Sequence, residues 1–111
     1  MVLSRKPKFG ETERYARAGG RMNSRVSIAL EGEVNGETKR GEGYTIDISS
    51  KGCLVAVPVE FSIGQQLKLT NLVNQNVSDV NLVWRGHQGT AGWELGLELK
   101  NPPFDFWGLE F

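Results

Sequence analysis

The sequence predicts an all-β protein whose single domain is built from about six short antiparallel strands. From residue 26 onward, apolar and polar side chains alternate with a period of two, the pattern of strands with one buried face. Turn-forming residues separate these stretches, and no stretch has a convincing helical period. A length of 111 residues suffices for one hydrophobic core but not for two. We expect the strands to close into a small barrel or to pack as a sandwich, since closure removes exposed strand edges.

The first two predicted strands form a hairpin. Residues 26–34 alternate between apolar and polar side chains, and Asn35-Gly36 follows them. This dipeptide is a strong hairpin signal because both residues accept positive φ. The returning strand is predicted from about residue 37 to residue 48, with Gly41 and Gly43 indicating a bulge or a sharp bend inside it.

The rest of the chain continues the same pattern. After a turn at residues 49–52, the remaining predicted strands are 53–57, 65–70, 77–85 and 93–99. In the strand at 77–85 the alternation places Trp84 on the same face as Val80 and Leu82, and a loop at residues 86–90 follows. The aromatic-rich tail, residues 104–111, is expected to fold back and plug one end of the barrel as a single helical turn.

Charge is distributed unevenly along the chain. The formal net charge is zero, from 13 basic and 13 acidic residues. Residues 1–25 carry seven of the basic and two of the acidic side chains, a net charge of +5, so residues 26–111 carry −5. Few apolar residues lie in the first segment, which therefore buries too little surface to offset its ordering entropy. We divide the chain into a flexible basic arm, residues 1–20, and a barrel domain, residues 21–111.

Composition also argues against several functional classes. No stretch of 18 or more apolar residues and no secretory h-region is present, so we expect no membrane insertion. A single cysteine suits a reducing compartment, so we expect a cytoplasmic protein. The only histidine, His87, falls in a predicted loop, and Cys53 falls in an apolar strand, where a core role is expected. With no metal-ligand cluster and no catalytic motif, we expect neither an enzyme nor a cofactor. Zero net charge argues against DNA as a partner.

Two short motifs indicate an anion-binding site. Arg21 and Arg25, four residues apart, stand directly before the first predicted strand, while Asp47, Ser49 and Gly52 stand between the second and the third. In an antiparallel pair the start of one strand lies beside the end of the next, so these residues should meet at one end of the barrel. Arginine binds phosphate or the O6/N7 edge of guanine, and a carboxylate accepts hydrogen bonds from guanine N1 and N2. Guanine nucleotides fit this combination.

At these residues the sequence resembles the PilZ domain family, which is marked by RxxxR before its first strand and [D/N]xSxxG between its second and third. Arg21–Arg25 matches the first motif, and Asp47-x-Ser49-x-x-Gly52 matches the second without departure. The resemblance covers roughly residues 20–107; residues 81–85 are similar to the family's fifth strand and residues 93–99 to its closing strand. It implies a six-stranded antiparallel Greek-key split barrel that binds the bacterial second messenger cyclic di-GMP. We also expect a downstream protein partner, because an arm ordered by the ligand would expose a new surface.

The resemblance also implies roles for individual residues. Arg21 and Arg25 would bind phosphates and guanine edges, Asp47 and Ser49 would read a guanine, and Gly52 would shape the turn. Arg17, four residues before Arg21, is a possible third contact, because RxxxR occurs twice. Two further residues are weaker candidates. Trp84 is expected either to stack on a base or to lie in the barrel core, and Arg85 follows it.

Three functions are compatible with these features. The first is a non-enzymatic cyclic di-GMP receptor whose arm becomes ordered over the barrel end when the ligand binds. The second is a small OB-like barrel that binds single-stranded nucleic acid through the basic arm, against which the net charge of −5 on residues 26–111 argues. The third is an adaptor that recognises only protein and binds no nucleotide.

Overall fold

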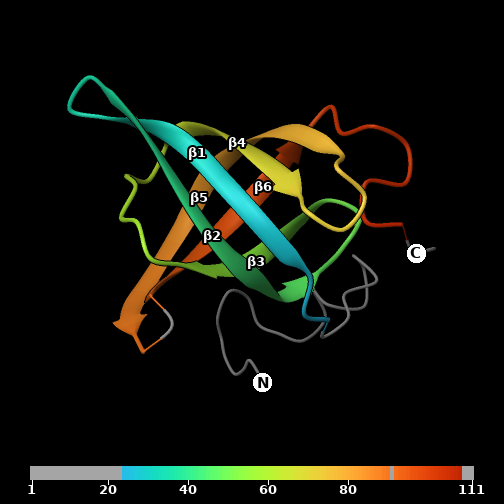
Figure 1. The fold of residues 1–111 in the computed structure, drawn as a ribbon, viewed down its shortest axis with the longest axis horizontal. Coiled ribbons are helices and arrows are strands. Elements are labelled where there is room, and N and C mark those ends of the chain that lie inside the picture. The colour runs from blue at the N-terminus through green and yellow to red at the C-terminus, as the bar shows by residue number, and fades with distance from the viewer. Residues whose placement is uncertain (1–23, 91, 109–111) are drawn as a thin grey trace.

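The computed structural model describes residues 24–90 and 92–108, and within them every regular element is a β-strand. The six strands follow one another with short connections (Figure 1). Their bounds are β1 (Ser27–Val34), β2 (Glu37–Ile48), β3 (Gly52–Val57), β4 (Gln66–Asn71), β5 (Val77–Gly89) and β6 (Gly92–Lys100). The predicted all-β class and the number of strands are confirmed.

The strands form a closed barrel in the order β1-β2-β3-β6-β5-β4. Every neighbouring pair is antiparallel, including β1 with β4, which closes the barrel through the pairs from Ile28↔Asn71 to Glu31↔Lys68. The chain passes from β3 to β4, which are not neighbours in the barrel, because β6 lies beside β3 and β1 lies beside β4; this crossover gives the Greek-key arrangement. The sheet therefore closes as a barrel, and the sandwich alternative is wrong.

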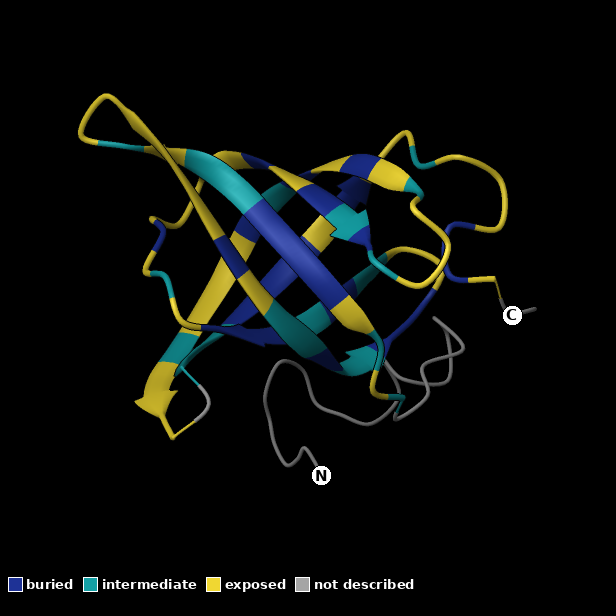
Figure 2. Cartoon of the chain, in the orientation of Figure 1, coloured by how far each residue is buried: buried dark blue, intermediate teal, exposed yellow. Residues whose placement is uncertain are grey.

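The core lies inside the barrel, where alternate residues of each strand converge (Figure 2). The strand side chains that fill it are mainly Ile, Leu and Val, whose branched shapes pack well against a curved sheet. At roughly 1.5–3 kcal/mol for each fully buried aliphatic or aromatic side chain, this cluster is the main source of stability. Its fully buried members include Ile28, Leu30, Ile48, Val55, Val57, Phe61, Leu69, Val80, Leu82 and Leu95.

The β1–β2 hairpin has the turn that the sequence predicts. Asn35 and Gly36 have φ values of 54° and 81°, the positive pair that a two-residue hairpin turn needs. The register from Ser27↔Tyr44 to Val34↔Glu37 is continuous. The bulge expected near Gly41 and Gly43 therefore lies elsewhere, between Thr45 and Asp47, where β2 pairs with β3.

Strand β5 differs most from its prediction. It continues to Gly89, so residues 86–89, expected to be a loop, belong to the strand, and His87 is an exposed strand residue. Register shifts interrupt its pairing with β6 between Leu82 and Trp84 and again between Arg85 and Gln88. The first shift reverses the alternation, so Leu82 lies in the core while Trp84 lies outside it and is 37% exposed.

The tail that follows β6 folds back over one end of the barrel, as expected (Figure 1). Phe106 and Trp107 are buried and join the core, with their rings edge to face and centroids 4.8 Å apart. The predicted helical turn is wrong, because the tail bends through turns in which Asp105 and Gly108 have positive φ. No helix in the described parts of the chain is long and apolar enough to cross a membrane.

Candidate functional site

The segment that enters β1 is fixed by a buried threonine of β2. Thr45 is 1% exposed, and its Oγ1 accepts a hydrogen bond from the Val26 N–H at 2.8 Å and donates one to the Ser24 carbonyl. The Thr45 N–H in turn donates to the Val26 carbonyl at 3.0 Å. These three bonds hold the backbone on both sides of Arg25, so the second arginine of RxxxR extends from a well-defined position.

The side chain of Arg25 lies on an aromatic ring. Its guanidinium carbon is 4.1 Å from the centroid of the Tyr44 ring, a cation–π contact on the outer surface of the barrel. Arg25 itself is exposed, so the edge of its guanidinium can still donate to a ligand. Neither Tyr44 nor Thr45 was among the predicted site residues. Their positions two and three residues before Asp47, in the strand that pairs with β1, could have indicated them.

The turn between β2 and β3 is organised around Ser49, which is 6% exposed. Its Oγ accepts hydrogen bonds from the N–H groups of Lys51 and Gly52, both at 3.2 Å, and its own N–H donates to the Gly52 carbonyl at 2.9 Å. The Ser49 hydroxyl group therefore stabilises the turn. A guanine that contacts Ser49 would share this hydroxyl with the N–H groups of Lys51 and Gly52.

Gly52 is needed for space rather than for an unusual backbone conformation. Its φ is not positive, and it begins β3 at a position that pairs with Glu98 of β6. A Cβ at this position would fall more than 1 Å inside the ordinary contact distance of 3.4 Å from the carbonyl oxygen of Leu97. The last residue of the DxSxxG motif thus allows the β3 and β6 backbones to approach closely.

Asp47 and Trp84 lie in one row across the outside of the barrel. Asp47 pairs with Leu54, Leu54 pairs with Gly96, and Gly96 pairs with Trp84, so the row crosses β2, β3, β6 and β5. At about 4.8 Å between neighbouring strands, the two ends are roughly 14 Å apart. Leu54 is half-buried and Gly96 is buried, so Leu54 separates the acidic end of the row from the aromatic end.

Trp84 is placed by glycines on two strands. A Cβ on Gly86 would lie 2.5 Å from the Trp84 ring, and one on Gly96 would lie 3.0 Å from the Trp84 Cβ. The indole therefore lies over both glycines on the outer face, and the predicted alternative of a core position is wrong. Its outward position is compatible with stacking on a flat ligand.

Electrostatic effects at the site act on the neighbouring thiol. Burial raises the pKa of Cys53 strongly, and the charge of the Asp47 carboxylate raises it further. The thiol belongs to the core cluster, as the sequence predicts, and it stays protonated at neutral pH, so it is a poor nucleophile. Among the described residues, no three His, Cys, Asp or Glu side chains are arranged to hold a metal ion.

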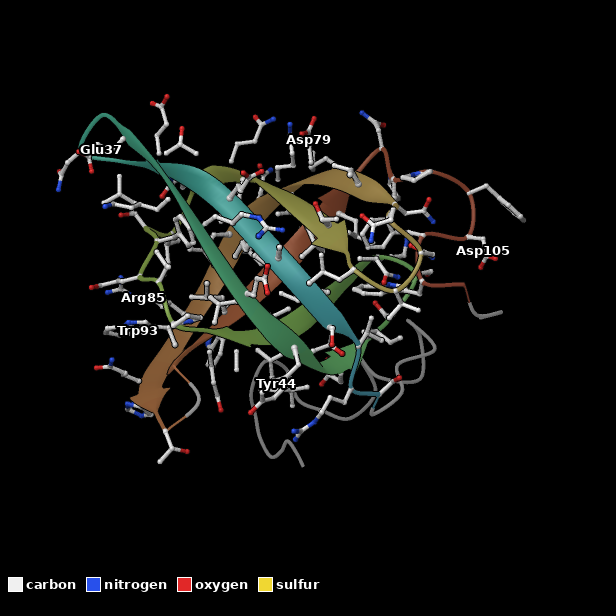
Figure 3. All side chains as sticks on the ribbon, in the orientation of Figure 1. Glu37, Tyr44, Asp79, Arg85, Trp93 and Asp105 are labelled. Atoms are coloured by element: carbon white, nitrogen blue, oxygen red, sulfur yellow. The ribbon has the colours of Figure 1, made fainter. Side chains whose placement is uncertain are left out.

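Arg85 has other partners. Its guanidinium donates to Glu60 Oε2 at 2.8 Å and to the Phe61 carbonyl at 3.2 Å, and lies 5.4 Å from the centroid of Trp93 (Figure 3). These contacts fasten the segment between β3 and β4 to the barrel. Figure 3 also shows that Arg85 and Trp93 lie away from Tyr44, the residue that Arg25 contacts.

The structure thus brings five residues, predicted or newly identified, to the end of the barrel where β1 begins and β2 ends: Arg25, Tyr44, Asp47, Ser49 and Gly52. Arg17 and Arg21, together with the predicted arm at residues 1–20, lie outside the described residues. A cation on an aromatic ring beside a carboxylate and a serine turn is a surface that can bind a molecule with both phosphates and guanine-type N–H donors.

A family model agrees with this arrangement. The model of the PilZ domain matches residues 14–105, most of the chain and all six strands. The chain belongs to the PilZ domain family. This family consists of nucleotide-binding receptor modules for cyclic di-GMP, and the resemblance seen in the two motifs is confirmed at the level of the family. No curated protein and no solved structure matches the chain significantly.

Proposed function

We propose that this PilZ domain is a non-enzymatic receptor for cyclic di-GMP. The observation that carries the proposal is the position of Arg25, the last residue of RxxxR. Its backbone is held by Thr45 and its side chain lies on Tyr44, beside the C-terminal end of β2 that carries Asp47. Cyclic di-GMP offers two phosphates for the arginine and guanine N–H groups for the carboxylate. Both kinds of contact are charge-assisted, and such bonds contribute about 1.5–3 kcal/mol each.

The outer row supports a base-stacking contact. A guanine that pairs with Asp47 would extend over Leu54, and a second flat group would reach Trp84 at the opposite end of the row. Gly96 is buried under Trp84, and a side chain there would push the indole away from the barrel. The geometry therefore accommodates a ligand with two planar bases better than a single mononucleotide.

The mechanism that we propose is ordering of the basic arm. Residues 1–25 carry a net charge of +5, and the ligand brings two negative charges, so binding reduces the repulsion among the arginines. Ordering a residue costs about 1–2 kcal/mol of backbone entropy, so several charge-assisted bonds are required to fold the arm over the barrel. The ordered arm would present a new surface to a downstream protein.

Isothermal titration calorimetry with cyclic di-GMP tests the receptor function. We expect saturable binding by the unaltered chain and a loss of affinity of about tenfold to a hundredfold in Arg25→Ala, because one charge-assisted bond disappears. Asp47→Asn should weaken binding to a similar extent. Arg40→Ala is the matched control, since Arg40 pairs with Glu42 at 2.6 Å near the hairpin end of β2 and should leave the affinity unchanged.

Two results would contradict the proposal. One is the absence of binding by the unaltered chain, and the other is equal affinity in Arg25→Ala and Arg40→Ala. Binding of a single-stranded oligonucleotide that falls steeply with salt and is not displaced by cyclic di-GMP would favour the nucleic-acid alternative. Arm ordering is measured separately by tryptic cleavage within residues 1–25, which the ligand should slow.

A further inference from the structure

The C-terminal tail is fastened to the barrel at one backbone carbonyl. The carbonyl oxygen of Phe106 accepts hydrogen bonds from the side-chain amides of Asn71, Asn74 and Asn76 at 3.1, 3.2 and 3.3 Å. Asn71 is fully buried, and its Oδ1 also accepts the Val73 N–H at 2.9 Å. These three asparagines, at the end of β4 and in the loop that follows it, fix where the tail crosses the end of the barrel.

The next residue, Trp107, connects the tail to the DxSxxG turn. The Trp107 Nε1–H donates to the Ser49 carbonyl at 2.8 Å, and both residues are only 6% exposed. The ring of Trp107 packs edge to face on Phe106, which sets its orientation. Figure 1 shows the tail passing beside both the β4–β5 loop and the connection between β2 and β3.

This bond acts on the residue that organises the turn. The carbonyl of Ser49 belongs to the same peptide group as the Ser50 N–H, so a donor on that carbonyl fixes the plane of the 49–50 peptide. The Ser49 hydroxyl simultaneously holds the N–H groups of Lys51 and Gly52. Without Trp107, the buried carbonyl would lack this donor, and rotation of the peptide toward another partner would disturb the turn.

We infer that Trp107 is a positioning residue for the ligand site: the tail, locked by the asparagine amides, holds the Ser49 turn in the geometry that reads the nucleotide. This inference rests on the proposed function, because it assigns the tail a role at that same site. The role is distinct from packing, since a phenylalanine at position 107 would retain an aromatic ring in the core yet could not donate to the Ser49 carbonyl.

Trp107→Phe tests the inference, with Trp93→Phe as the matched control. Trp93 is a partly buried tryptophan on β6 that packs against the core and pairs with Val57 and Gln88, away from the turn. In calorimetric titrations well below the melting temperature, we expect about a tenfold loss of affinity for cyclic di-GMP in Trp107→Phe, the effect of one hydrogen bond, and none in Trp93→Phe. Equal affinity in the two variants would overturn the inference.

A second readout needs no ligand. Amide hydrogen exchange of Lys51 and Gly52, whose N–H groups bond to the Ser49 hydroxyl, should become faster in Trp107→Phe and remain unchanged in Trp93→Phe. If Trp107→Phe does not fold, Asn74→Ala provides a milder variant, because it removes one of the three side-chain amides that bond to the Phe106 carbonyl. In Asn74→Ala, exchange at Lys51 and Gly52 should also become faster, but by a smaller factor.

The two readouts separate the inference from the proposed function. If the unaltered chain binds no cyclic di-GMP, the proposed function fails, and the exchange rates alone decide whether the tail holds the turn. Unchanged exchange at Lys51 and Gly52 would then refute the coupling, and faster exchange would support it.

Discussion

Replacing Gly52 with alanine should destabilise the barrel considerably, although the change adds only one methyl group. The new Cβ would fall more than 1 Å inside normal contact with the Leu97 carbonyl oxygen, which is backbone and cannot rotate away. Strands β3 and β6 would have to separate locally, at the point where Gly52 pairs with Glu98. Overpacking costs about 1–3 kcal/mol, and each ladder hydrogen bond that is lost costs about 1 kcal/mol more.

The expected total is about 3 kcal/mol, which should lower the melting temperature by roughly 10–20 °C in a domain of this size. Thermal unfolding followed by circular dichroism measures the change. Gly89→Ala is the matched control, because the nearest atom to its new Cβ would be 4.0 Å away. That variant should melt within a few degrees of the unaltered protein, since a tolerated glycine-to-alanine change contributes at most about 1 kcal/mol.

A third variant distinguishes lack of space from a need for positive φ. Asparagine tolerates the left-handed region better than alanine, so it would be the milder replacement if the turn needed such a conformation at position 52. The close approach of Leu97 predicts that Gly52→Asn is at least as harmful as Gly52→Ala. A melting temperature within about 2 °C of the original for Gly52→Ala, or clear recovery in Gly52→Asn, would refute the reasoning.

Three further predictions concern other parts of the barrel. Cys53 should resist alkylation at pH 8 until denaturant is added. The free energy of unfolding should fall as the pH rises above about 8.5, because the unfolded chain then releases a thiol proton that the folded chain retains. Urea titrations at pH 7.5 and 9.5 measure this fall, which Cys53→Ala should reduce. Glu60→Gln should cost less than about 1 kcal/mol, because the pair with Arg85 is half-exposed, and a larger loss that persists in concentrated salt would contradict this. Asn35→Ala should cost about 1 kcal/mol in thermal unfolding, because φ is 54° there, whereas Asn35→Gly should be nearly neutral.

Local signals in the sequence were sufficient to predict most of the barrel. The period of two places the strands, because each strand has one face in the core, and Asn35-Gly36 identifies the first hairpin from the conformations that two residues accept. The position of Arg25 beside the second motif also follows from antiparallel pairing alone, once the hairpin is known.

The errors arise where one extra residue or a distant contact decides the structure. The shift between Leu82 and Trp84 reverses the alternation in β5, and no composition signal marks where such a bulge will form. The role of Thr45 depends on partners across the hairpin, and the bond from Trp107 to Ser49 joins residues 58 positions apart. Contacts of this kind are properties of the closed barrel and cannot be obtained from periodicity.

Ser49 and Trp107 are 58 residues apart in the sequence, so the candidate ligand site depends on the whole fold. The turn at Ser49 is complete only when the Trp107 indole has docked, and the barrel closes only when β1 and β4 have paired through four residue pairs. A partly folded chain that contains only the early hairpins would lack the binding geometry. Ligand binding should therefore stabilise only the fully folded state, and its full free energy, about 2.7 kcal/mol at a hundredfold excess over Kd, should appear in global unfolding rather than in local opening.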